Sequence, residues 1–287
     1  MELPGSVAQR RLGRELMKLR LAAELSRPKA AARINLAPST LGRIEGSIQV
    51  PHRRTLLDIL DMYGASTETR AALLALRERA SNREAGGWLE PYLEDLPPAY
   101  ADYIGLEIDA EMLQVCESVL IPGLIQTEDY ARAVLTALLP TATASAIERR
   151  LAVRMQRQGI LSGEEPVRYE AVVDEAALWR VVGSPAVMSS QLRALINLGS
   201  NVKLQVVPYG RGAHPGMLGS LVIVKFRDTE APDVALIESA AGHLLIEESG
   251  ALSTYHATYK RLQRMALSRR DSVGLIEAVV RDHERKA

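Results

Sequence analysis

The chain has 287 residues with 35 basic and 35 acidic side chains, so net charge alone indicates no partner. Its single cysteine, Cys116, excludes an intrachain disulfide framework and fits a reducing compartment. The sequence shows no signal peptide and no apolar run long enough to span a bilayer. We therefore expect a cytoplasmic protein with no membrane partner.

Residues 26–46, SRPKAAARINLAPSTLGRIEG, have the pattern of a helix-turn-helix. The small residue Ala31 stands where two helices would cross, and Asn35, which tolerates positive φ, stands between them. The apolar residues that would hold the two helices together are Ile34, Leu36, Leu41 and Ile44. The second helix would present a short polar face that fits a major groove, so the pattern predicts DNA binding. An ordinary helical bundle without a ligand is the alternative.

Amphipathic segments on both sides support this prediction. Residues 9–24 carry leucines at helical spacing, and residues 53–63 repeat the pattern up to Gly64. A further helix over 67–80 would complete an all-α domain of five helices, which we place at residues 1–80.

The outward residues of this domain divide into two predicted roles. Ser39, Thr40 and Arg43 share one helix face and are predicted to contact bases. Arg43 is the candidate for a bidentate contact to guanine, with a phosphate contact or an ion pair with Glu45 as its alternative role. The residues predicted to contact DNA phosphates are Arg27, Lys29, Pro38, Arg53 and Arg54.

Charge is segregated along the chain. Residues 1–54 hold 11 basic and 4 acidic side chains, a net charge of +7, which leaves 24 basic and 31 acidic side chains, a net charge of −7, in the rest. A basic N-terminal region on an acidic body indicates that only one end meets a polyanion.

Residues 81–103 are predicted to be a connector that packs against the body. Pro and Gly are mixed there with four of the chain's twelve aromatic residues, which a flexible linker would not need.

Residues 104–287 predict a larger α+β domain. A β-hairpin is expected around Asp109 to Glu111, and Thr127 is expected to cap a helix that carries Glu128 and Asp129 in its first turn. The other expected elements are helix 145–161, strand 167–174, helix 175–182, helix 186–198, strand 202–208, a glycine-rich loop 209–219, strands 220–226 and 234–239, and helices 249–267 and 272–284.

The first eighty residues resemble the repressor-type (XRE-type) helix-turn-helix domains of lambdoid phage repressors and their bacterial relatives. The later runs VLIPGLIQTEDYARAVL, RMQRQGIL, VVDEAALWRVVG, VMSSQLRAL and VKLQVVPYGRGAHPG resemble the C-terminal domain fused to such domains in actinobacterial regulators. The resemblance implies a transcription factor and supplies no ligand for the C-terminal domain. It also implies that small proteins encoded beside such regulators are candidate co-regulators.

The helix-turn-helix departs from this family pattern in three places. Ala37 replaces the usual Ser/Thr cap, which forfeits about 1 kcal/mol, and Gly42 inside the second helix costs about 1 kcal/mol relative to Ala. Ile48 and Gln49 replace a basic pair, and the glycine has moved to Gly46. We interpret this as a recognition helix that is marginal alone and tightens on its operator.

The C-terminal domain offers a dispersed set of polar residues at loop ends near strand termini. The candidate effector or partner site comprises Gln126, Thr127, Arg154, Arg157, Glu175, Tyr209, His214 and Glu238. Structural ion pairs of Arg154 and Arg157 with nearby carboxylates, and a plain hairpin loop at 210–219, are the alternative. No catalytic motif, metal site or cofactor site is predicted, because Asp174 and Glu175 fit a helix cap and the histidines are scattered.

Together these features predict a regulator that binds a double-stranded DNA operator as a homodimer. Each protomer would read one of two half-sites about one helical turn apart. The C-terminal domain would serve dimerisation and respond to a small-molecule effector or a small co-regulator protein. A DNA-tethered enzyme is the alternative.

Overall fold

The computed structural model describes residues 6–81, 84–227, 231–239 and 242–286. The chain comprises two compact units, residues 1–93 with 104–109, and residues 94–103 with 110–287. The first unit is helical and the second contains a six-stranded mixed sheet, which confirms the predicted fold class.

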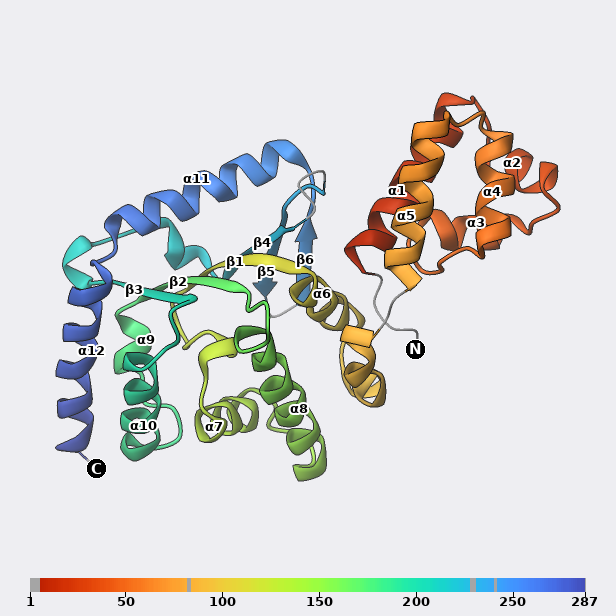
Figure 1. The fold of residues 1–287 in the computed structure, drawn as a ribbon. Coiled ribbons are helices and arrows are strands. Elements are labelled where there is room, and N and C mark those ends of the chain that lie inside the picture. Colours follow the sequence, from red (N-terminus) through yellow and green to blue (C-terminus); the bar gives the residue numbers. More distant parts are fainter. Residues whose placement is uncertain (1–5, 82–83, 228–230, 240–241, 287) are drawn as a thin grey trace. The chain divides into compact units, whose positions relative to one another are not determined.

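The helical unit contains the five predicted helices (Figure 1). They are α1 (Val7–Ala22), α2 (Arg27–Arg33), α3 (Pro38–Glu45), α4 (Arg53–Met62) and α5 (Thr67–Ser81). Asn35 adopts φ 51° between α2 and α3, as the sequence predicts, and Gly64 ends α4 with φ 65°. Glu24 and Ser47 also adopt positive φ, at 53° and 59°, in the turns that follow α1 and α3.

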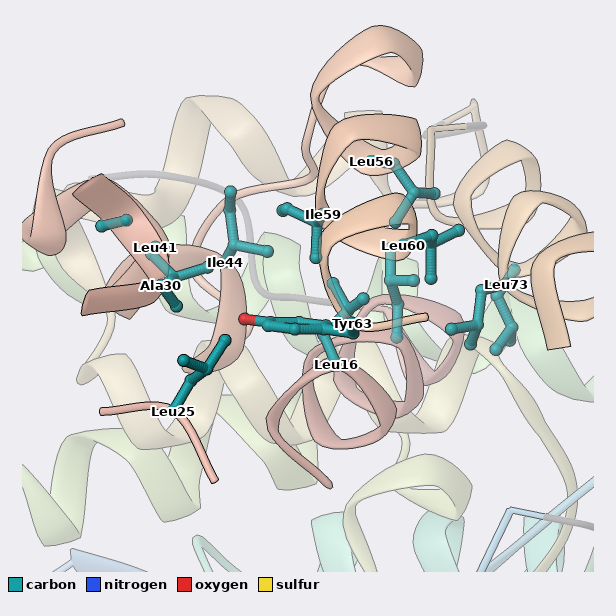
Figure 2. Close-up of a cluster of buried hydrophobic side chains, with 13 residues drawn as sticks. Leu16, Leu25, Ala30, Leu41, Ile44, Leu56, Ile59, Leu60, Tyr63 and Leu73 are labelled. Carbon is teal, nitrogen blue, oxygen red and sulfur yellow. The ribbon is translucent and has the colours of Figure 1, made fainter. Parts of the chain in front are cut away.

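One apolar core unites these helices. Ala31 and Leu41 are fully buried where α2 meets α3, and leucines of α1, α4 and α5 close the other sides. Figure 2 shows Tyr63 crossing this core from the end of α4, with its hydroxyl oxygen on the side of Ile44. Helix packing of this kind, rather than helix propensity, supplies most of the stability of such short helices.

Gly13 lets α1 approach the end of α3 closely. A Cβ at this position would stand 2.8 Å from the carbonyl oxygens of Ile44 and Glu45 and 2.7 Å from the hydroxyl of Ser47. A side chain there would force the two helices apart, so glycine is required by tertiary contact rather than by local conformation.

Residues 84–108, most of the predicted connector and its continuation, are helical. They form the 3-10 helix η1 (Glu84–Asp95) and helix α6 (Pro98–Ile108). The hairpin predicted around Asp109 is therefore wrong, because residues 104–108 belong to α6. Residues Tyr103 to Glu107 are all buried, and a short run buried on every side has no periodicity that separates helix from strand.

The sheet of the α+β unit has the strand order β3-β2-β1-β4-β5-β6. Its strands are β1 (Ala110–Glu117), β2 (Arg168–Asp174), β3 (Val202–Val207), β4 (Leu221–Phe226), β5 (Val234–Ser239) and β6 (Gly242–Ile246). β1, β2 and β3 run parallel to one another, and β4, β5 and β6 add antiparallel pairs at β1's other side. The expected strands 167–174, 202–208, 220–226 and 234–239 correspond to β2 to β5, and the second arm of the expected hairpin corresponds to β1, whereas β6 was not predicted.

Helices cover both faces of this sheet (Figure 1). The helices of the unit are α7 (Glu128–Leu138), α8 (Ala144–Arg157), α9 (Ala176–Trp179), α10 (Pro185–Ile196), α11 (Ser249–Met265) and α12 (Arg269–Glu284). Tyr259 and Leu262 of α11 pack against Cys116, Val172 and Ile223 on one face. α7, α8 and α10 lie on the other side, and α12 packs along α10 and β3.

Two helix predictions need correction in this unit. The helix expected over 175–182 is the single turn α9, after which Arg180 is extended. Thr127 occupies the N-cap position of α7 but accepts no side-chain cap hydrogen bond, and its hydroxyl donates to Gln191 Oε1 at 3.3 Å. Among the described helices, none has the length and apolarity required to cross a bilayer.

Candidate nucleic-acid interface and ligand cavity

The helix α3 presents a short polar face to solvent. Ser39 and Arg43 are exposed and Thr40 is half-buried, whereas Leu41 and Ile44 lie in the core. Residues three and four apart share one side of a helix. The three side chains predicted to contact bases therefore lie together on the side of α3 that faces away from the core.

Four of the five predicted phosphate-contacting residues are exposed at helix N-termini. Lys29 lies in the first turn of α2, Pro38 is the first residue of α3, and Arg53 and Arg54 begin α4. The N-terminus of a helix attracts anions through its unpaired N–H groups and its dipole. These positions suit a surface that meets a DNA backbone.

Arg27, the fifth, has a partner inside the protein. Its Nε donates to Glu45 Oε2 at 3.1 Å, although the Arg27 side chain is 46% exposed. The same carboxylate accepts from Arg20, whose Nε lies 2.6 Å from Oε1 and whose Nη2 lies 3.2 Å from Oε2. The Glu45 side chain is 1% exposed, so it ties α1 and α2 to the end of α3 from within the core.

The buried ion pair of Arg20 and Glu45 contributes to two pKa shifts in the core. The hydrogen bond to Glu45 raises the pKa of Arg20 above its ordinary value. Burial raises the pKa of Tyr63 to about 12, and the charge of Glu45 adds to the rise. The sequence analysis considered Glu45 as a partner for Arg43 and did not anticipate its burial, because the charges that surround it lie 18 and 25 residues away in the chain.

The start of α3 is weak, as the sequence indicates. Ala37 occupies the N-cap position and provides no side-chain hydrogen bond to the first turn. Gly42 lies under Arg27, and a Cβ added at Gly42 would stand 3.5 Å from the nearest side-chain atom, Arg27 Cδ. That separation is an ordinary van der Waals contact, so the helix has room for alanine there.

We expect the double substitution Ala37→Ser and Gly42→Ala to stabilise α3 by about 1–2 kcal/mol, from the added cap and the better helix former. Amide hydrogen exchange of the full chain should slow in α3, and operator affinity should rise. Gly274→Ala is the matched control, because it adds the same methyl group in open space on α12 of the other unit. Slower exchange in α3 with unchanged affinity would contradict the idea that α3 tightens on DNA.

A row of polar side chains crosses the sheet of the α+β unit. Cys116 of β1 is paired with Leu221 of β4, and Leu221 is paired with Ile237 of β5. The next positions, Glu117, Ser220 and Glu238, therefore stand side by side, and Ser220 Oγ donates to Glu117 Oε1 at 2.7 Å. Side chains of a strand alternate between faces, so this row and the Val115–Val222–Leu236 row behind it share the face opposite α11.

These two rows form the floor of a cavity of about 260 Å³, which we call the sheet cavity. Val134 and Leu138 of α7 and Arg154 and Arg157 of α8 form its opposite wall. The segment from Glu117 to Leu124, together with Tyr100, Tyr103 and Gln126, completes the lining. Four of the eight predicted effector-site residues, Gln126, Arg154, Arg157 and Glu238, are thus brought together.

The two arginines of the sheet cavity are held differently. Arg157 is buried, donates to the hydroxyl of Tyr100, and lies 5.2 Å and 5.4 Å from the ring centres of Tyr100 and Tyr103. Arg154 Nη1 donates to Gln126 Oε1 at 3.0 Å, and its buried Nε has no hydrogen-bond acceptor among the described residues. The ion pair with a carboxylate considered for Arg154 is absent from the part of the chain that the structure describes.

The remaining predicted effector residues lie elsewhere. Thr127 borders a separate open depression beside α7 and the end of α10. Glu175 Oε2 accepts from the backbone N–H of Tyr209, and His214 Nε2 lies 2.6 Å from Asp174 Oδ2. Glu175, Tyr209 and His214 do not line the sheet cavity. Their contacts join the end of β2 to the loop after β3.

Two models of protein families match the chain. A model described as a helix-turn-helix domain matches residues 11–73, and a model described as a domain of unknown function, DUF5753, matches residues 100–278. The second match covers more than half of the chain. The chain belongs to the DUF5753 family. No curated protein and no solved structure matches it.

The helix-turn-helix match over residues 11–73 supports DNA binding by the N-terminal unit. The DUF5753 match brings no chemistry with it, so the C-terminal unit is interpreted from its own residues. Among the described residues, no group of three or more His, Cys, Asp or Glu side chains is arranged to hold a metal ion.

Cys116 of this DUF5753 protein is a core residue near His214. A Cβ on Gly216 would stand 3.0 Å from its sulfur and 3.1 Å from His214 Nδ1, so glycine lets the loop pack between them. Burial raises the pKa of the Cys116 thiol to about 12, and the nearby carboxylates of Glu117 and Asp174 add to the rise. The thiol is therefore protonated at neutral pH and is a poor nucleophile.

Sequence reasoning missed two residues of the sheet cavity that carry charge or hydrogen bonds. Glu117 stands in a mostly apolar run of the sequence, and Ser220 begins an expected strand, so the local pattern singles out neither residue. Strand alternation places Glu117 on the same face as Val115, but its pairing with Ser220, 103 residues away, has no local signal.

Proposed function

We propose that the chain is a sequence-specific transcriptional regulator of the lambda-repressor-like, XRE type, acting in the cytoplasm. The observation that carries the proposal is the exposed face of α3, where Ser39, Thr40 and Arg43 lie together. Lys29, Arg53 and Arg54 are exposed at the N-termini of α2 and α4. The net charge of +7 on residues 1–54 supports the same surface. The resemblance of residues 1–80 to the helix-turn-helix domains of actinobacterial regulators also supports DNA binding by this surface.

We further propose that it binds its operator as a homodimer, because one such unit reads only a few base pairs. The C-terminal unit would supply the dimer contacts and would respond to a small molecule or to a small co-regulator protein. We propose no catalytic activity for it. Asp174 Oδ1 accepts from the backbone N–H of Ala176, which supports a capping role, and the protonated Cys116 offers no nucleophile.

The experiment that tests this proposal is selection of genomic DNA fragments by the purified full chain, followed by footprinting of the selected site. We expect a site with two half-sites about 10 base pairs apart and a complex containing two protomers. Binding to every fragment alike, at every salt concentration, would contradict sequence-specific recognition.

Replacement of Arg43 by alanine is expected to reduce discrimination at one base pair by about 1–3 kcal/mol, because a bidentate contact to guanine would be lost. Replacement of Arg53 should instead weaken binding to all sequences and lower the slope of log K against log salt by about 0.9. Competition binding to operators with each base varied distinguishes the two effects.

Arg33→Ala is the control for both variants. It removes the same charge from an exposed position in the last turn of α2, outside the predicted interface. If Arg43→Ala and Arg53→Ala changed affinity uniformly and equally, Arg43 would be a phosphate contact and the assignment of base reading to it would be wrong.

A further inference from the structure

We propose that the sheet cavity binds a zwitterionic small molecule of amino-acid size, with its ammonium group at Glu117 and its carboxylate at Arg154. This assigns a ligand class to the effector-responsive unit. The effect of the ligand on DNA binding rests on the proposed function. Binding of the ligand itself does not, because the cavity and its charges belong to the α+β unit alone.

The acidic side of the cavity has a carboxyl group without a cation. Glu117 accepts from Ser220, and no basic side chain among the described residues pairs with it. Burial raises its pKa to about 7, and the neighbouring charge of Glu238 adds to the rise. A ligand ammonium beside Glu117 would supply the positive charge that this carboxyl group lacks.

The basic side has a guanidinium without an anion. Gln126 Nε2 donates to the carbonyl oxygen of Ile121 at 2.7 Å, which holds the Gln126 amide oxygen toward Arg154. The acceptor in that contact is an uncharged amide, and the buried Nε of Arg154 has no acceptor among the described residues. A carboxylate in the cavity beside Arg154 would give its guanidinium the charged partner that the described residues do not supply.

Size and lining restrict the ligand further. The cavity volume of about 260 Å³ lies just below the range of ligand pockets, which begins at roughly 300 Å³, so only a small ligand fits. Two glutamates and two arginines line it, so a ligand that carries both charges and no net charge fits best. Val134, Leu138 and the Val115–Val222–Leu236 row supply an apolar surface, which favours an apolar side chain.

The test is binding of apolar L-amino acids to the full chain by calorimetry, with L-leucine as the first probe. Two analogues each remove one charge from leucine: 4-methylpentanoate lacks the ammonium group and 3-methylbutylamine lacks the carboxylate. We expect the zwitterion to bind and each analogue to bind roughly ten-fold or more weakly, as expected when a charged hydrogen bond is lost. The proposal is overturned if no apolar L-amino acid binds, or if an analogue binds as tightly as its parent.

Variants locate the site. Glu117→Gln and Arg154→Met should each weaken binding by roughly ten-fold or more, whereas Arg149→Met, on the same helix but ion-paired with Asp95 at the surface, should not. Circular dichroism checks that the variants fold. If Arg154→Met is unfolded, the nearly isosteric Glu117→Gln provides the test. Equal affinity of Glu117→Gln and the wild type for L-leucine would overturn the proposal.

Measurements with DNA separate this inference from the proposed function. A zwitterion that binds and shifts operator affinity supports both. If it binds without changing operator affinity, the ligand site stands and effector control by this ligand is wrong. Failure of the full chain to bind any DNA would contradict the proposed function, whereas the ligand affinity measured by calorimetry would still stand.

Discussion

Glu45→Gln is expected to lower the free energy of unfolding of the helical unit by about 3–5 kcal/mol, the usual consequence of removing one member of a buried ion pair. Arg20, whose side chain is 9% exposed, would keep its charge without a counterion. The loss approaches the whole stability of a small domain, so the helix-turn-helix would unfold at moderate denaturant concentrations.

The measurement is amide hydrogen exchange of the full chain in a denaturant series, read separately for α1 to α5 and for the α+β unit. The helices should lose protection in Glu45→Gln while β1, β2 and β4 keep it. Glu15→Gln is the matched control, because Glu15 pairs with Lys18 at the surface and its loss should change stability by less than about 1 kcal/mol.

A double substitution separates the buried charge from the packing. Arg20→Met with Glu45→Gln removes both charges, and we expect it to recover much of the lost stability, since a buried pair contributes little net stability over apolar groups. Equal destabilisation of the single and double variants would mean that the packing of Glu45, and not its charge, supports the unit.

Glu117→Gln is expected to stabilise the α+β unit by about 3 kcal/mol above pH 7 and to have almost no effect below pH 4.5. Burial raises the pKa of Glu117 from 4.5 to about 7 in the folded protein. Between these values the unfolded chain releases a proton that the folded chain retains, so the stability of the wild type falls as pH rises through this window. Glutamine has no such ionisation and can still accept the hydrogen bond of Ser220.

Thermal or denaturant unfolding of the unliganded full chain at pH 5 and pH 8 measures this difference. The two proteins should be close in stability at pH 5 and diverge by pH 8, with the variant more stable. Glu165→Gln is a suitable control, because Glu165 pairs with Arg227 at the surface. A constant difference between wild type and Glu117→Gln across pH would contradict burial of an ionisable Glu117.

The helix-turn-helix was predicted from the local sequence pattern, and the structure has the predicted features that depend on backbone conformation and helix spacing. Asn35 adopts positive φ because few other side chains tolerate it, and Ala31 is buried where two short helices cross. The missing side-chain cap at Ala37 could also be predicted from the sequence, since a cap depends on the residue type at the start of the helix. The hairpin expected around residues 109–111 shows the limit, because its first arm belongs to α6 and a run buried on all sides has no period that separates helix from strand.

The candidate sites divide in the same way. The polar face of α3 follows from helical spacing, so Ser39, Thr40 and Arg43 were found together. Only half of the predicted effector set shares one cavity, because loop ends near strand termini meet according to strand order. Gln126, Arg154, Arg157 and Glu238 share the sheet cavity, while His214 and Tyr209 belong to contacts at the end of β2.

By itself the sequence determined where most helices and strands lie, the turn at Asn35 and the basic character of the N-terminal unit, because these depend on spacing and composition within about twenty residues. Tertiary structure alone decided the burial of Glu45 between Arg20 and Arg27, and the meeting of Glu117 with Ser220 across 103 residues. Charge burial and strand pairing depend on which distant segments pack together, and no local pattern encodes that choice.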